Sequence, residues 1–221
     1  MSHEESASEV APNRRRRTQA ERSAATRERL LAATVECLHE LGYHHTTTYS
    51  VEQRAGVTRG ALLHHYSSKS ALLIAAAQYM VDTAERRFAA DVATLPAENL
   101  GEEISGLLWR QFTSQIFFAF MEISMAARTE PVLREEMLEP QQRLDAHCRE
   151  VVARLLGASV DDSDFVMGLE LSIRFMRGAA STAMLGERSE VDDKVHQEWQ
   201  RLVAPYFARW AHGSSDAASN G

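Results

Sequence analysis

With 221 residues, 44% of them hydrophobic, the chain is long enough to bury a core in one large or two small domains. No apolar run approaches the roughly 18 residues of a membrane helix, and Cys37 and Cys148 lie far apart, so we expect a reduced cytoplasmic protein without a membrane segment. The net charge of −7 is unevenly divided, because residues 14–80 carry +5 and residues 81–221 carry −9. This predicts that any nucleic acid binds the first third of the chain.

The beginning of the chain is polar and strongly charged. Residues 1–13 carry three acidic side chains, and the four arginines Arg14–Arg17 follow at once. We interpret residues 1–18 as a flexible arm. The arginine run is typical of an arm that reaches the backbone or minor groove of DNA, which we favour because it adjoins a basic segment. The alternative is a solvated tract that only aids solubility.

A helix is predicted over residues 19–41, and two shorter helices around a tight turn follow it. The first helix has an apolar face made by leucines and a valine at three- and four-residue intervals, and Gly42 is placed to end it. The second helix should span Thr48–Ala55. Gly56 then reverses the chain, because glycine takes a positive φ without steric cost, and Thr58 caps a third helix that reaches Tyr66.

The third helix should have an inner and an outer face. Leu62 and Tyr66 lie one turn apart and would face inward. At about 100° per residue, Gly60 and His64 then point away from Leu62. Small residues and hydrogen-bonding side chains therefore lie where a DNA major groove could approach closely.

Residues 20–85 resemble the DNA-binding domain of TetR-family transcriptional regulators. The resemblance is carried by Glu40 to Tyr43, Thr46 to Thr48, Ala55 to Thr58, Leu62 to Tyr66, and Ser68-Lys69 followed by Leu72. This chain has Glu52 where the family usually has alanine, and Leu63 where it often has tyrosine. The resemblance implies an all-α protein of about nine helices. A three-helix helix-turn-helix domain (19–68, with the motif at about 47–66) would precede a larger effector-binding and dimerisation domain (69–212) and a disordered tail (213–221).

The predicted DNA contacts follow from the outer face and the resemblance. We expect base contacts from Arg59, Gly60, Ala61 and His64, with Leu63 against a thymine methyl group, and backbone contacts from Thr48, Tyr49, His65 and Lys69.

The rest of the chain is predicted to be helical, with no strand alternation and no internal repeat. A fourth helix, capped by Ser68, should link the two domains. The predicted helices are 69–92, 99–112, 115–128, 131–156, 163–185 and 191–211. Pro140 and Pro205 lie inside two of them and should bend or interrupt them.

The last two helices are predicted to form a homodimer interface. Their large apolar residues follow helical spacing, and a single helix-turn-helix rarely reads enough base pairs alone. The alternative is that both helices only close their own domain. The predicted interface residues are Phe165, Leu169, Ile173, Met176, Trp199, Leu202 and Phe207.

An effector site is predicted among the helices between residues 99 and 185. Aromatic and methionine side chains at helical spacing are more often core than ligand site, but the resemblance implies a cavity for an unknown, partly apolar small molecule. The candidate lining residues are Trp109, Phe112, Phe117, Phe118, Met121, Met125, Arg128, Met167, Arg174 and Phe175.

No motif for catalysis, a cofactor or a metal is present. The pairs His44-His45 and His64-His65 are adjacent, so on a helix they point to different sides and make poor metal clamps. We therefore expect a dimeric regulator, most simply a repressor, that binds a double-stranded DNA operator and is not an enzyme. The alternatives are an activator, a helical binding module that does not read DNA, and a helical enzyme assembled without local motifs.

Overall fold

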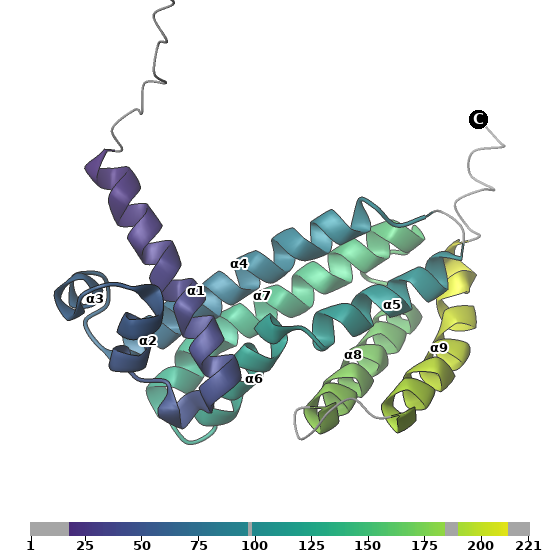
Figure 1. Cartoon of the computed structure of the whole chain (residues 1–221). Coiled ribbons are helices and arrows are strands. Elements are labelled where there is room, and N and C mark those ends of the chain that lie inside the picture. Colours follow the sequence, from purple (N-terminus) through teal and green to yellow (C-terminus); the bar gives the residue numbers. More distant parts are fainter. Residues whose placement is uncertain (1–17, 97–98, 184–189, 212–221) are drawn as a thin grey trace, which may run out of the picture.

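The chain folds into helices only. The computed structural model describes residues 18–96, 99–183 and 190–211, and within these ranges it contains nine helices and no strand (Figure 1). The predicted all-α class is therefore confirmed. The Arg14–Arg17 run and the predicted tail at 213–221 lie outside the described residues.

Local capping residues set the start of the first four helices: α1 (Gln19–His45), α2 (Thr48–Ala55), α3 (Arg59–His65) and α4 (Lys69–Val92). In each case a side-chain hydroxyl accepts a hydrogen bond of 3.1–3.2 Å from the backbone amide three residues ahead. The capping residues are Thr18, Thr47, Thr58 and Ser68. The predicted caps at Thr58 and Ser68 are confirmed.

Two glycines reverse or bend the chain in the first domain. Gly42 leaves helical geometry (φ 75°, ψ 172°), so the straight part of α1 ends where predicted, and one further turn continues to His45. Gly56 adopts the left-handed conformation (φ 61°, ψ 43°) between α2 and α3. Both φ angles favour glycine over any residue with a side chain.

The helix α4 connects the two parts of the molecule through its packing. Leu72 and Ala76 join a core with residues of α1, α2 and α3. Met80 and Val81 join a second core with α6 and α7, and Phe88 joins a third with α5, α7, α8 and α9. A movement of α4 would therefore change the packing of all three cores.

The remaining helices are α5 (Leu100–Phe112), α6 (Gln115–Ala127), α7 (Pro131–Leu156), α8 (Ser163–Ala183) and α9 (Glu190–Ala211). α7 and α9 continue through Pro140 and Pro205 without interruption. α8 and α9 pack together at the end of the molecule opposite α3 (Figure 1). None of the described helices combines the length and the apolar character needed to cross a bilayer.

Two glycines allow α9 to approach its neighbours. A Cβ at Gly168 of α8 would lie 1.9 Å from the ring of Tyr206, and one at Gly101 of α5 would lie 2.8 Å from the carbonyl oxygen of Ala204. Such distances are sterically forbidden, so these two positions fix how closely the last helix packs. Near the end of α8, by contrast, a Cβ at Gly178 would meet nothing within 4 Å.

Candidate nucleic-acid interface and effector cavity

The outer face of α3 is open to solvent. Leu62 is fully buried and Tyr66 is 6% exposed, so the predicted inner face is confirmed. Arg59 is exposed and makes no hydrogen bond or ion pair within the described part of the chain. A Cβ on Gly60 would meet nothing closer than 4.0 Å. Packing inside the protomer therefore does not require glycine here, and the space in front of the helix is free for another molecule.

The other residues predicted to contact DNA surround this face and differ in their exposure to solvent. Tyr49 is 68% and Leu63 47% exposed, and His64 is exposed as well. Thr48, Ala61 and His65 are half-buried. Burial lowers the pKa of His65, with smaller contributions from His64 and Arg27, so its imidazole favours the neutral form. Its contact with DNA stays a prediction, as do the contacts of the other residues.

Lys69 has a partner inside the protein. Its Nζ donates to the backbone oxygen of Tyr43 at 2.9 Å and lies 4.3 Å from the centre of the Tyr43 ring. Burial lowers the pKa of Lys69. A phosphate contact from Lys69 stays a prediction, and in the free protein the ammonium group holds the end of α1 against the start of α4.

The same tyrosine is held from the other side by α6 and the turn after it. The backbone N–H of Tyr43 donates to Glu122 at 2.9 Å, and its hydroxyl donates to Glu130 at 2.6 Å. Burial, with the hydrogen bond to Glu130, raises the pKa of Tyr43 to about 12, so the phenol remains a donor. Tyr43 thus joins the DNA-binding part of the chain to α6.

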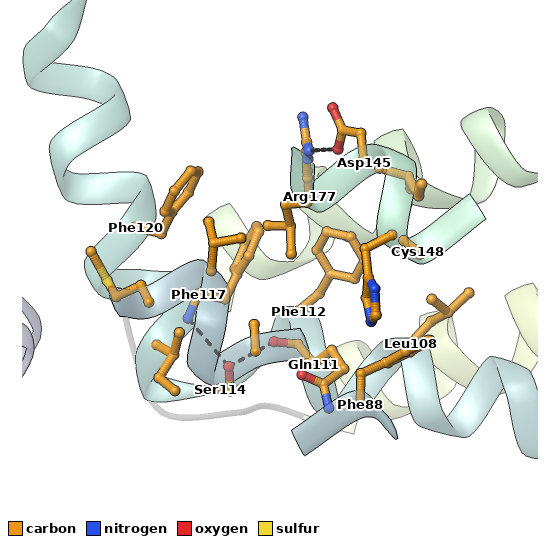
Figure 2. A pocket seen from close by; sticks show the side chains of 17 residues that line it. Phe88, Leu108, Gln111, Phe112, Ser114, Phe117, Phe120, Asp145, Cys148 and Arg177 are labelled. Carbon is orange, nitrogen blue, oxygen red and sulfur yellow. Dashed lines mark hydrogen bonds and ion pairs between the residues drawn. The ribbon is translucent and has the colours of Figure 1, made fainter. Parts of the chain in front are cut away.

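A cavity lies between α4, α5, α6, α7 and α8. Its volume is about 60 Å³, measured as the space open to the centre of a water molecule. Figure 2 shows Phe112, Phe117 and Phe120 around it, with Arg177 and Asp145 at one edge. The lining is mostly apolar, and its polar members are Gln111, Ser114, Asp145, His147, Cys148 and Arg177.

Comparisons with known proteins agree on one family. A sequence model described as "Bacterial regulatory proteins, tetR family" matches residues 30–76. The HTH-type transcriptional regulator CymR of Pseudomonas putida is 28% identical over 89% of this chain and 98% of its own length. The HTH-type transcriptional repressor AcnR of Corynebacterium glutamicum is 32% identical over 58% of this chain and 65% of its own length.

The chain is thus similar to the TetR family over residues 30–76 and to HTH-type transcriptional regulators over most of its length. Among solved structures, a TetR transcriptional regulator from Rhodococcus sp. RHA1 covers 85% of this chain and 97% of its own, at 20% identity and a TM-score of 0.57. FadR of Bacillus subtilis, solved in complex with stearoyl-CoA, covers 80% of this chain and 97% of its own, at 13% identity and a TM-score of 0.61. At these identities the structures establish the shared fold.

Most of the predicted effector residues do not line this cavity. Only Phe112 and Phe117 of the ten do so. The ring of Trp109 stacks on His196, Phe118 stacks on His39, and Phe175 stacks on Trp199. Met121 is half-buried away from the lining, and the side chains of Met125, Arg128, Met167 and Arg174 are exposed. These eight do not line this cavity, because the rotation of each helix turns them toward other neighbours or toward solvent.

The lining residues on α4 and α7 were not predicted from the sequence. Met80, Val81, Ala84 and Phe88 come from α4, while Leu144, Asp145, His147 and Cys148 come from α7. The apolar stripe of α4 was visible in the sequence, but a stripe that packs in a core and one that lines a cavity have the same spacing. His147 and Cys148 carried no signal that could have found them.

The predicted dimer residues are almost all inside the protomer. Phe165, Leu169, Ile173, Met176, Trp199 and Phe207 are each at most 7% exposed and belong to one core. These six cannot contact a partner chain directly, so the prediction is wrong for them. Leu202 is 64% exposed. The spacing revealed an apolar face on each helix but could not show that the two faces cover each other and α5.

Proposed function

We propose that this TetR-family regulator is a homodimeric cytoplasmic repressor that binds a near-palindromic operator and is released from it by a small, partly apolar effector. The observation that carries the proposal is the position of α4. This helix begins beside α3, where Lys69 contacts the end of α1, and its middle lines the cavity. The names of the relatives support regulation by DNA binding, and one solved relative holds stearoyl-CoA.

Recognition of the operator's base sequence would depend on the exposed face of α3. Arg59 is free to form a bidentate pair with guanine, which is the commonest specific contact in the major groove. Gly60 and Ala61 would allow the helix to approach the bases, and Leu63 could meet a thymine methyl group. Tyr49, Thr48 and His65 flank this face and would contact the backbone.

The partner surface would be the solvent side of α8 and α9. Met167 and Leu171 are 61% and 62% exposed and lie one helical turn apart, while Val195 and Leu202 are 41% and 64% exposed on α9. Gly178 continues the α8 stripe with open space in front of it. We call these five residues the outer stripe. Exposed apolar side chains in a row are typical of an association surface, and a two-fold dimer would present two copies of α3 to one face of DNA.

Release from the operator would follow from a movement of α4 and α6, the two helices that contact both the cavity and the DNA-binding domain. Four residues of α4 and three of α6 line the cavity, namely Met80, Val81, Ala84 and Phe88, and Ile116, Phe117 and Phe120. Two residues after Phe120, α6 holds Tyr43 through Glu122. An effector acts only by binding one arrangement of these helices more tightly than the other. We infer that the bound arrangement changes the spacing of the two α3 helices.

A gel shift and a promoter reporter together test this function. The protein should retard its own upstream DNA but not a scrambled duplex at the same salt, and it should lower expression from a reporter that carries this DNA. Raised expression would show activation in place of repression. Failure to retard any duplex at low salt would show a binding module that does not read DNA.

A further inference from the structure

The effector cavity contains a polar atom for which the described part of the chain supplies no partner. The Nε2 of His147 is buried and makes no hydrogen bond. Its ring is fixed edge-on against Phe88, with the ring centres 6.1 Å apart. Buried polar atoms in folded proteins are nearly always paired, and each exception calls for a physical reason. A ligand atom bonded to this nitrogen would provide that partner.

Both carboxylate oxygens of Asp145, at the edge of the cavity, already accept hydrogen bonds from the protein. One oxygen of Asp145 accepts a hydrogen bond from Arg177 at 2.7 Å, and the other accepts one from Gln141 at 2.9 Å. The Arg177 guanidinium has five N–H groups and uses one of them here. The lining thus offers spare donors but no unpaired carboxylate, so it favours a neutral or anionic ligand over a cation.

The remaining polar lining groups have partners or are uncharged. Ser114 caps α6 and donates to the backbone oxygen of Gln111 at 2.7 Å, and the Gln111 amide donates to Asp91 at 3.1 Å. Burial raises the pKa of the Cys148 thiol to about 12, so it stays protonated. His147 therefore stands out as the group that lacks a hydrogen-bond partner among these lining residues.

The size of the cavity limits the ligand. The volume open to the centre of a water molecule is about 60 Å³, so the space that the atoms of a ligand could fill is larger. An engineered cavity of roughly 150 Å³ binds benzene, so the space fits one substituted ring and not a long acyl chain.

We propose that the effector is a compact, mostly apolar molecule of about one substituted ring, carrying a single oxygen group that hydrogen-bonds to His147. The aromatic walls formed by Phe88, Phe112, Phe117 and Phe120 would cover the ring. The oxygen group is a hydroxyl or a carboxylate, which the donors of Arg177 tolerate. This inference rests on the proposed function, because it assigns the cavity to the effector.

Binding of a matched panel to the full-length protein tests the ligand class. Thermal unfolding with phenol, benzoate, toluene, benzylamine and stearate would give the relative affinities, since a ligand that binds the folded state raises the Tm. Phenol or benzoate should bind roughly two- to tenfold more tightly than toluene, the range expected for one net hydrogen bond. Tightest binding by toluene, benzylamine or stearate would overturn the proposal.

Two variants of His147 locate the hydrogen bond. His147→Leu should remove the preference for phenol over toluene, whereas His147→Gln, which keeps a hydrogen-bonding group, should retain part of it. An unchanged preference in His147→Leu would overturn the role of His147. If this variant does not fold, the wild-type panel decides the ligand class.

Operator release by the same probes, measured in parallel, separates the two proposals. Binding with the stated preference but without release supports the ligand class and contradicts the effector role. Release by a molecule outside this class, with no binding of phenol or benzoate, overturns the ligand class and leaves the regulator function standing.

Discussion

At the scale of single residues, Arg59 is the side chain best placed to read a base. It is exposed on α3 without a partner in the described part of the chain, whereas Arg54 nearby is paired with Glu40 at 2.5 Å and Glu36 at 3.5 Å. Two basic residues of the same motif thus have different tasks: Arg54 ties α2 to α1, and Arg59 is available to DNA. Charge counted along the sequence could not distinguish them.

Arg59→Ala should weaken operator binding by about 1–3 kcal/mol, the loss of a bidentate contact to guanine, while affinity for scrambled DNA falls much less. Arg87→Ala is the matched control, because Arg87 is an exposed arginine on the cavity half of α4 and its removal changes the net charge equally. Both are measured by gel shift at one salt concentration. Equal affinities for Arg59→Ala and wild type would remove Arg59 from base reading.

At the scale of elements, helix limits were predictable and helix neighbours were not. The limits depend on local chemistry: Thr58 and Ser68 cap helices and Gly56 takes a positive φ, as the sequence predicted, and Gly42 ends the straight part of α1. Which side of a helix meets which neighbour depends on the whole assembly. For this reason the inner face of α3 was predicted correctly, whereas the buried Phe165 and Trp199 were wrongly assigned to a dimer surface.

Gly168→Ala should destabilise the packing of α9 on α8 by about 1–3 kcal/mol, the usual result of overfilling a packed site. The added Cβ would lie 1.9 Å from the Tyr206 ring. In Gly106→Ala, the added Cβ would meet only the end of the Arg110 side chain at 3.5 Å, so this helix-interior change should stabilise by about 0.5–1 kcal/mol. Denaturant unfolding measures both, and a stable Gly168→Ala protein would contradict the close approach.

Leu171→Asp and Leu202→Asp should dissociate the dimer, because each would bury a charge at the centre of the outer stripe. Val132→Asp on α7 is the control, since Val132 is 65% exposed and lies outside this surface. Sedimentation should give the mass of one chain for the first two variants and of two chains for the control. A two-chain mass for all three would move the interface elsewhere.

At the scale of the whole molecule, the proposed release from the operator requires coupling between the cavity and α3. Tyr43 is the point where α1, α4 and α6 meet through Lys69 and Glu122. The path from Phe120 in the cavity lining to Glu122 is two residues along one helix. α6 therefore offers a second route to the DNA-binding domain beside α4.

Glu122→Ala should reduce the effect of effector on operator affinity by about 0.5–2 kcal/mol, the range found for residues that carry coupling. Effector affinity itself should change little, because Glu122 is not among the lining residues. Glu150→Ala, at an exposed position on α7, provides the control for the lost charge. Gel shifts with and without effector measure the coupling, and full coupling in Glu122→Ala would confine the path to α4.

The most direct test of the account is selection of bound duplexes from a random DNA pool, with wild type and Leu171→Asp in parallel. Because a two-fold dimer presents two α3 helices to successive turns, the wild-type pool should converge on an inverted repeat with half-sites about one helical turn apart or a multiple of it. The Leu171→Asp pool should show weaker enrichment and no fixed spacing. A wild-type pool with no enriched sequence, or with a single asymmetric site, would contradict the account.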